Sequence, residues 1–353
     1  MLKQKWVLPA LAGLIVVMVV VICLLGRQGS GGGEADFFQE EPGEVEQTTA
    51  GNAEALLAKL STEQKVGQLF LILPDALAEE PAAAGTTTLS AKELKALETY
   101  PVGGFVLTGS NIAGKETFGL AKTETPAALG STGDGAKVKD AAATIGKALA
   151  DLGFQMNLAP TCDVGSALSF SESPEQAAMC TSAAVEGFHE GGVACVLKHY
   201  PGQGGTNASE GASLTETWET MRTTSLYPFQ AGMAAGADAI MVSHVTTPNA
   251  SSDGLPASLS QEMITSKLRG ELRFSRLIMT APLSDPAIAQ HYDNGDAALR
   301  AFQAGADILL QPEDLEAAYN AVLAAVKDGT ISQQRLDESV LRVLQLKERY
   351  GLI

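Results

Sequence analysis

The chain has 353 residues, enough for one large α/β domain or two ordinary ones, and 45% of them are hydrophobic, which supports a sizeable core. Its 41 acidic and 24 basic residues give a formal net charge of −17. This excess of carboxylates argues against a nucleic-acid partner, because it would repel phosphates.

The N-terminal segment carries the signal of a membrane anchor. Residues 6–25 contain no charged side chain, Lys3 and Lys5 precede them, and Arg27 follows. At about 1.5 Å per residue, a helix of this length crosses the roughly 30 Å hydrocarbon core of a membrane. We therefore expect residues 1–27 to form a cytoplasmic tip and one transmembrane helix, with the rest of the chain extracytoplasmic. A cleaved signal peptide is the alternative, but the apolar run is long for one and no small-residue cleavage site closes it.

A linker and the start of an ordered domain follow the anchor. Residues 28–52 are rich in Gly, Ser, Glu, Gln and Thr, which predicts a flexible acidic linker. An ordered domain is expected over residues 53–353. Near its start the pattern predicts a helix with Ser61 as N-cap and Gln64 as its capping-box partner.

Apolar runs and amphipathic segments alternate along this domain. Strands are expected at 66–73, 104–107, 154–159, 194–197, 239–242, 277–279 and 307–310, and helices at 136–152, 174–190, 226–235, 260–272 and 312–327. The count is seven strands, or six if the first run is helical. This alternation is typical of an α/β fold with parallel units closed into a TIM-type (β/α)8-like barrel. A doubly wound open sheet is the alternative, and the absence of a G-x-G-x-x-G turn opening a helix weakens it.

Two details refine the barrel prediction. No convincing buried strand lies between residues 107 and 136, so we expect the barrel to be incomplete at its third strand. Residues 190–199, 234–244 and 303–312 share one pattern, in which a helix ends at Gly, a short turn carries a small residue or Asp, and a buried strand begins.

The strand at 194–197 runs into Lys198, His199 and a Gly-rich loop that extends to Gly211. Active sites of α/β barrels lie at the carboxyl ends of the strands, so this cation and this imidazole mark the candidate site. Glu210 is the one carboxylate in the nine residues after Pro201. The loop is therefore suited to hold a ligand but poor in ionised groups.

Five stretches, in order, resemble glycoside hydrolase family 3, N-terminal domain, and especially its β-N-acetylglucosaminidase (β-hexosaminidase) branch. They are STEQKVGQLFLI, VGGFVLTGSNI, LGFQMNLAPTCDV, KHYPGQGGT and ISQQRLDESVLRVLQLKERYGLI, and the resemblance covers roughly residues 56–353. It implies a barrel, a glycan containing N-acetylglucosamine as partner, no cofactor, and retaining glycoside hydrolysis. That chemistry requires a carboxylate nucleophile and a general acid/base.

The positions that match the family's catalytic residues lack the necessary groups. Ala281 stands where the branch has its nucleophilic Asp, and a methyl group cannot attack an anomeric carbon. Ser209 and Gly211 stand where it has an Asp-x-His acid/base dyad. The family's D-Q-E-G-G-R-V substrate loop has no counterpart. The resemblance therefore predicts a degenerate active site with no catalytic residue of the family pattern.

Lys198 and His199 match a pair that, in the family, hydrogen-bonds the hydroxyls of N-acetylglucosamine. The resemblance therefore implies that both residues bind substrate. The alternative is purely structural: Lys198 forms an internal ion pair with a barrel carboxylate such as Asp163, and His199 caps a loop. The sequence leaves both interpretations open.

The other histidines and the cysteines have simpler interpretations. His244, at the end of a strand, is expected to be a packed imidazole, His189 a favourable charge at a helix end, and His291 a solvated side chain. Four scattered histidines give no metal-ligand spacing, so no metal is expected. Cys162, Cys180 and Cys195 are expected to be buried free thiols, and a Cys162–Cys195 disulfide is the alternative.

Three functional hypotheses follow. The first is a membrane-anchored, extracytoplasmic family 3-like barrel that has lost hydrolysis and acts as a cell-wall glycan-binding or scaffold protein. The second is a divergent β-N-acetylhexosaminidase with Glu210 as acid and Asp285 as nucleophile, which requires the two carboxyl groups to lie about 5–5.5 Å apart. The third is an envelope protein-interaction module.

Overall fold

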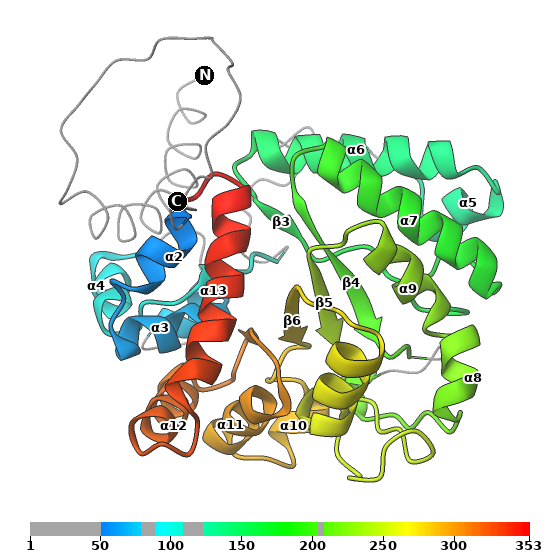
Figure 1. The fold of residues 1–353 in the computed structure, drawn as a ribbon. Coiled ribbons are helices and arrows are strands. Elements are labelled where there is room, and N and C mark those ends of the chain that lie inside the picture. Colours follow the sequence, from blue (N-terminus) through cyan, green and yellow to red (C-terminus); the bar gives the residue numbers. More distant parts are fainter. Residues whose placement is uncertain (1–50, 79–88, 109–122, 204–207) are drawn as a thin grey trace, which may run out of the picture.

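The computed structural model describes residues 51–78, 89–108, 123–203 and 208–353 (Figure 1). The predicted anchor at residues 1–27 and nearly all of the predicted linker at 28–52 lie outside these residues. Among the residues that are described, none of the helices combines the length and the apolar character needed to cross a membrane.

Seven short parallel strands form the centre of the described fold. They are β1 (Phe70–Ile72), β2 (Gly104–Phe105), β3 (Met156–Asn157), β4 (Ala194–Tyr200), β5 (Ala239–Val242), β6 (Leu277–Thr280) and β7 (Leu309–Leu310). They pair as two sheets, in the orders β2-β1-β7 and β3-β4-β5-β6. A parallel bridge between Met279 and Ile308 connects β6 to β7. The strands thus follow one arc, β2-β1-β7-β6-β5-β4-β3, and the predicted TIM-like α/β fold with parallel strands is confirmed.

The two ends of this arc, β2 and β3, flank the stretch of sequence in which no third strand is predicted. Among the described residues, β2 pairs only with β1, and β3 pairs only with β4. Residues 109–122, which separate these two strands along the chain, are outside the described part. That the barrel is incomplete at its third strand therefore stays a prediction.

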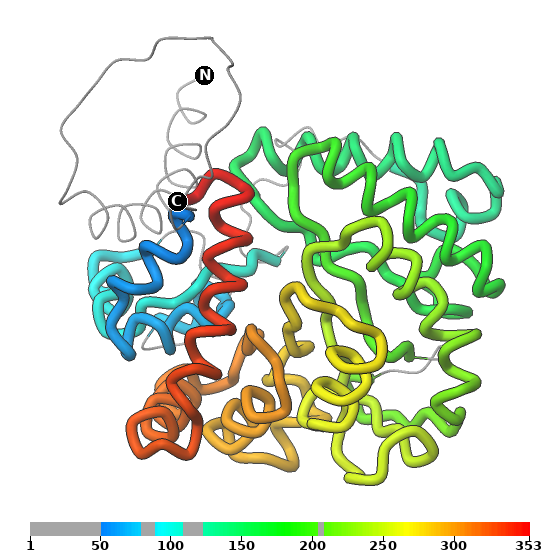
Figure 2. Tube along the Cα trace, viewed as in Figure 1, coloured from blue at the N-terminus to red at the C-terminus, as the bar shows by residue number. Residues whose placement is uncertain are grey.

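Helices follow the strands in the expected alternation. They are α2 (Asn52–Leu57), α3 (Thr62–Gln68), α4 (Ala91–Thr99), α5 (Pro126–Ser131), α6 (Gly135–Asp151), α7 (Pro174–Glu190), α8 (Trp218–Thr223), α9 (Tyr227–Ala234), the π-helix η5 (Glu262–Glu271), α10 (Pro286–Ala289), α11 (Asn294–Ala304), α12 (Leu315–Lys327) and α13 (Gln333–Arg349). In Figure 2 the red C-terminal helix lies beside the blue start of the described chain. Glu348 of α13 accepts a hydrogen bond from the backbone N–H of Asn52 (3.0 Å), which ties these two ends together.

The first apolar run, at 66–73, divides between two elements. Its first residues complete helix α3, and Phe70–Ile72 form β1. The predicted capping box is confirmed: the Ser61 hydroxyl accepts from the Gln64 N–H (3.2 Å), and the Gln64 side chain accepts from the Ser61 N–H (2.9 Å). The box fixes where α3 begins, and this single run supplies both the last turn of the helix and a strand.

Alternate side chains of the strands face two different cores. One set, drawn from all seven strands or the residues that follow them, forms a single apolar cluster: Leu71, Val106, Met156, Val196, Met241, Met279 and Leu310. Side chains from every strand meet only inside a barrel, so this cluster is the barrel interior. The intervening residues, such as Leu197 and Ile240, pack against the helices instead.

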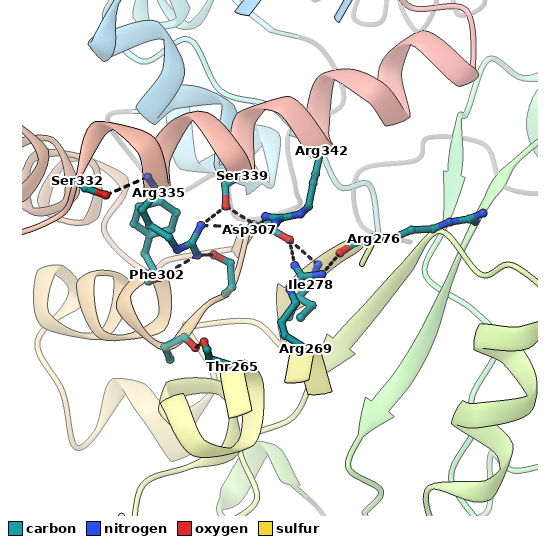
Figure 3. A network of polar contacts seen from close by, with 12 residues as sticks. Thr265, Arg269, Arg276, Ile278, Phe302, Asp307, Ser332, Arg335, Ser339 and Arg342 are labelled. Atoms are coloured by element: carbon teal, nitrogen blue, oxygen red, sulfur yellow. Dashed lines mark hydrogen bonds and ion pairs between the residues drawn. The ribbon is translucent and has the colours of Figure 1, made fainter. Parts of the chain in front are cut away.

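A buried carboxylate at the start of β7 anchors the closing helix α13 (Figure 3). Asp307 accepts hydrogen bonds from Arg342 (2.9 Å) and Ser339 (2.5 Å) of α13, from Arg269 of η5, and from the backbone N–H of Ile278 (2.9 Å). Its side chain is fully buried. These contacts join β7, its neighbour β6 and two helices at the amino ends of the strands. In α/β barrels this end contributes to stability, whereas active sites lie at the carboxyl ends.

Asp238, at the start of β5, forms a second anchor of the same kind. Its Oδ1 accepts from Arg349 (2.7 Å), and its Oδ2 accepts from Tyr350 (3.0 Å) and from the backbone N–H of Cys195 (3.1 Å). His189 Nε2 lies 2.8 Å from the same Oδ2. The prediction that His189 serves only as a charge at a helix end is therefore wrong, because the imidazole has a specific buried partner.

Candidate functional site

The carboxyl end of β4 places Lys198 at the mouth of the barrel. Lys198 lies two residues after Val196, whose side chain is in the barrel interior, so it projects from the same side of the strand. Its side chain is partly buried. Burial lowers the pKa of the Lys198 ammonium, and the charge of Asp163 partly offsets that effect. In the described part of the chain no carboxylate lies within the 4.0 Å of an ion pair with this ammonium.

Asp163 pairs with His199 rather than with Lys198. A parallel bridge between Thr161 and Lys198 sets the two segments side by side. The Nδ1 of His199 lies 3.0 Å from Asp163 Oδ2, and the backbone N–H of His199 donates to Asp163 Oδ1 (3.4 Å). Asp163 is 2% exposed, whereas the His199 side chain is 21% exposed. The alternative that pairs Lys198 with Asp163 is thus wrong, because the Asp163 carboxylate orients the imidazole of His199 instead.

The loop after β4 packs against the segment that follows β6. Ala208–Glu210 form a short 3-10 helix, η3, which contacts α10. Gly211 has φ +85°, and a Cβ placed on it would lie 3.9 Å from the Cβ of Ala287. Ser209 is partly buried and Glu210 is exposed. The structure therefore places the serine and glycine of the two dyad positions on this loop, where neither offers an imidazole or a carboxylate.

Ala281, at the nucleophile position, is buried at the mouth of the barrel. It follows β6 directly and is 5% exposed. Its backbone N–H donates to the carbonyl of Val242 (2.7 Å), which continues the pairing of β5 with β6. Its methyl group belongs to the interior cluster with Met241 and Met279. The position faces the site as the family pattern requires, but it contributes apolar packing only.

His244 ties the end of β5 to the segment that carries Asp285. Its Nε2 donates to the carbonyl of Pro282 (2.9 Å), and its Nδ1 accepts from the Ser258 hydroxyl (2.7 Å). Burial lowers the pKa of His244 to about 4, so the ring is neutral at physiological pH. The prediction of a packed imidazole is confirmed.

Asp285 lies beside this histidine at the start of α10. Its Oδ2 is 3.9 Å from His244 Nε2, and its side chain is 25% exposed. Burial raises the pKa of Asp285, and His199 opposes the shift. His199 thus acts electrostatically on both Asp285 and His244, which places these groups around one mouth.

Four polar groups meet at the mouth of the barrel. It gathers a cation, an oriented imidazole and two carboxylates, Asp163 and Asp285, at the carboxyl ends of the strands. Glu210 reaches the same face because η3 contacts α10, but its carboxylate is exposed. Sequence reasoning missed the pairing of Asp163 with His199. The signal for it is that Asp163 follows the expected strand at 154–159, and the next expected strand, at 194–197, leads directly into His199.

The three cysteines of the described part are free and buried. Burial raises the pKa of Cys195 to about 12, and it raises the pKa of Cys162 further. The prediction of free thiols is confirmed, and the alternative disulfide between Cys162 and Cys195 is wrong.

Comparison with known proteins places this chain in a family. Residues 43–346 match the model of the glycosyl hydrolase family 3 N terminal domain. The chain is 26% identical over 348 residues to a beta-N-acetylglucosaminidase/beta-glucosidase of Cellulomonas fimi, covering 84% of this chain and 59% of that protein. It is 35% identical over 184 residues to a beta-hexosaminidase of Stenotrophomonas maltophilia, covering 48% and 53%. The chain therefore spans little more than half the length of these relatives.

Solved structures agree with this placement. The β-N-acetylglucosaminidase of Paenibacillus sp. FPU-7, a family 3 glycoside hydrolase, superposes with a TM-score of 0.75 at 31% identity, over 83% of this chain and 63% of that one. The β-N-acetylhexosaminidase of Beutenbergia cavernae superposes with a TM-score of 0.67 at 27% identity, over 82% and 99%. With the family model matched over most of its length, the chain belongs to glycosyl hydrolase family 3.

Proposed function

We propose that this protein is a glycan-binding member of the family that does not hydrolyse by the family's route. The observation that carries the proposal is the set of side chains at the mouth of the barrel. Lys198 and the Asp163–His199 pair are in place, whereas Ala281 fills the nucleophile position with a buried methyl group. Ligands containing N-acetylglucosamine are the class that the names of the relatives indicate.

The polar groups fit a neutral sugar. Because His199 Nδ1 faces Asp163, Nε2 is the ring nitrogen through which the imidazole meets a ligand. The Lys198 ammonium offers hydrogen-bond donors that no carboxylate of the described chain takes up. Hydrogen bonds from charged donors are about twice as strong as neutral ones, so this lysine is the principal contact to a sugar hydroxyl. We further propose that the predicted anchor in residues 6–25 holds the barrel next to the cell wall, as a binding or scaffold protein.

An assay of hydrolysis tests the proposal. The purified protein is incubated with nitrophenyl β-N-acetylglucosaminide, and release of nitrophenol is compared with a no-enzyme blank. The expected result is release at the rate of the blank, because no carboxylate occupies the nucleophile position. Turnover that disappears in Glu210→Gln or Asp285→Asn would overturn the proposal, and Glu219→Gln on helix α8 is the matched control.

A divergent hydrolase is the second candidate, and one observation favours it. The contact between η3 and α10 brings Glu210 and Asp285 to the same face. Their properties nevertheless fit the roles poorly. A general acid has to be protonated, which burial favours, but Glu210 is exposed. A nucleophilic carboxylate has to be ionised, but burial raises the pKa of Asp285. Hydrolysis with retention requires the two carboxyl groups to lie about 5–5.5 Å apart.

A protein-interaction module is the third candidate. Among the described residues, the exposed large apolar side chains include Leu168 (62%) and Tyr227 (43%), and single exposed apolar residues are ordinary on a protein surface. A pulldown from membranes set beside a glycan-binding screen separates the two functions. Glycan binding that weakens in Lys198→Ala supports the sugar site over this candidate.

A further inference from the structure

The two buried anchors, Asp238 and Asp307, are built on one plan. Each aspartate follows a Gly-Ala pair at the start of a strand, and its Oδ2 accepts the backbone N–H of a residue on the neighbouring strand. For Asp238 that residue is Cys195 of β4, and for Asp307 it is Ile278 of β6. The repetition in sequence, Gly-Ala-Asp, is thus a repetition in structure.

The side chains around the two aspartates correspond as well. Each carboxylate binds an arginine near the C-terminal part of the chain, Arg349 or Arg342. Each also pairs with a side chain from the helix that precedes the neighbouring strand: His189 of α7 or Arg269 of η5. Imidazole and guanidinium therefore occupy equivalent places.

The anchors differ in chemistry at these two places. Where the Asp307 anchor has Arg269 and Ile278, the Asp238 anchor has His189 and Cys195. The Asp307 anchor shows that holding α13 requires neither an imidazole nor a thiol. His189 and Cys195, together with Asp238, bring nitrogen, sulfur and oxygen donors to one place. His189 Nε2 lies 2.8 Å from Asp238 Oδ2 and 3.8 Å from Cys195 Sγ, and the three ligand atoms all lie within 4.8 Å of one another.

We propose that His189, Cys195 and Asp238 form a binding site for a divalent transition-metal ion of the zinc class. Tetrahedral zinc, with bonds of about 2.0–2.3 Å, sets its ligand atoms about 3.3–3.6 Å apart. The distance from His189 Nε2 to Asp238 Oδ2 has to lengthen by about half an ångström to reach this spacing, and the distance from His189 Nε2 to Cys195 Sγ, 3.8 Å, is already close to it. Thiolate and imidazole together select zinc-like ions over magnesium or calcium. The His189 side chain is 32% exposed, which gives the ion a path from solvent and leaves its fourth position to water.

Binding of the ion changes one hydrogen bond and one protonation state. The ion replaces the hydrogen bond between His189 and Asp238, while Arg349 stays on Oδ1 and Tyr350 stays on Oδ2. The Cys195 thiol loses its proton to solvent on binding, because the thiolate is the metal ligand. Arg349 and Arg276, the latter 3.7 Å from Oδ1, weaken the attraction for a cation, and the new thiolate offsets part of their charge. The site lies at the opposite end of the barrel from Lys198 and does not depend on the sugar proposal.

Cobalt(II) serves as the test probe, because a cobalt–thiolate bond gives a charge-transfer absorption in the near ultraviolet. The full chain, stripped with a chelator, is titrated with cobalt and then with zinc. We expect one cobalt per chain, an absorption that zinc removes, and a rise in melting temperature with either ion.

Three variants make the test specific. Cys195→Ser and His189→Arg should abolish the absorption or weaken binding at least tenfold, whereas Cys180→Ser, a buried thiol on α7, should retain it. His189→Arg recreates the pairing of Arg269 with Asp307, so it removes a ligand while keeping the anchor. Absence of the absorption in the unaltered protein, or an equal absorption in His189→Arg, would overturn the proposal.

Discussion

Lys347 is a buried amine without a charged partner in the described structure. It lies on α13, is 6% exposed, and its Nζ donates to Gln68 Oε1 (2.6 Å). Gln68 in turn donates to the carbonyl of Pro101 (3.2 Å). Burial lowers the pKa of Lys347 to about 7, because no carboxylate compensates the lost hydration.

This lysine predicts a pH-dependent stability. The unfolded chain holds the Lys347 proton up to a pKa near 10.5, and the folded chain releases it near 7, so the unfolded state binds more protons between these values. The free energy of unfolding should therefore rise with pH across this window, by up to about 1.4 kcal/mol per pH unit, and the penalty is full below about pH 7. Lys347→Met should remove this slope. Denaturant unfolding at several pH values measures it.

The control for that measurement is Lys147→Met. Lys147 is exposed and pairs with Asp151 one helical turn away, so its loss should leave the slope unchanged. Equal slopes in the unaltered protein and in Lys347→Met would show that the amine keeps its proton when folded, in contradiction to the prediction.

At the scale of elements, α13 is the helix that unites the fold. Val343 and Leu346 of α13 reach the apolar cluster of the barrel interior. Arg335 and Arg342 surround Asp307, and Arg349 binds Asp238. One helix thus contacts the starts of two strands and the interior at once.

Asp307→Asn should be strongly destabilising. The substitution leaves Arg269 and Arg342 beside a buried amide in place of a carboxylate, and breaking a buried ion pair costs about 3–5 kcal/mol. Asp296→Asn is the matched control, because Asp296 pairs with Arg300 on the surface and such pairs contribute about 0–1 kcal/mol. Chemical denaturation compares the two. Similar losses in both variants would contradict the role given to Asp307.

Local patterns predicted the elements well where one signal dominated. The strand at 239–242 and the helix at 174–190 have the expected bounds, because a Gly turn or a capped Ser-Pro start delimits each apolar pattern. The run at 66–73 was ambiguous because both faces of its helix and strand parts are apolar. Periodicity cannot divide such a run, and only the packing of β1 between β2 and β7 decides it.

Across the whole molecule, the sequence predicts which strand ends carry the candidate residues but not which side chains pair. Lys198, His199 and Ala281 lie at the expected strand ends. One of the two interpretations left open by the sequence pairs Asp163 with Lys198, yet Asp163 orients His199, because the register between the two segments selects the partner. The same holds for the donors at residues 189, 195 and 238. They come from three elements, so no spacing motif could reveal them.

The two ends of the barrel have different tasks in this account. The starts of the strands carry the aspartate anchors that hold α13, and the carboxyl ends carry the groups that we propose bind sugar. Replacement of the nucleophile by Ala281 leaves the anchors unaffected, since that position belongs to the mouth. The proposed loss of hydrolysis is therefore compatible with an intact fold.

One NMR measurement tests the proposal that the protein binds the sugar without cleaving it. The protein is mixed with the N-acetylglucosamine disaccharide, and the same sample is observed for saturation transfer to the sugar and for its cleavage over time. We expect saturation transfer that falls at least severalfold in Lys198→Ala, with the disaccharide intact throughout. Cleavage that stops in Asp285→Asn, or the absence of any saturation transfer in the unaltered protein, would contradict it.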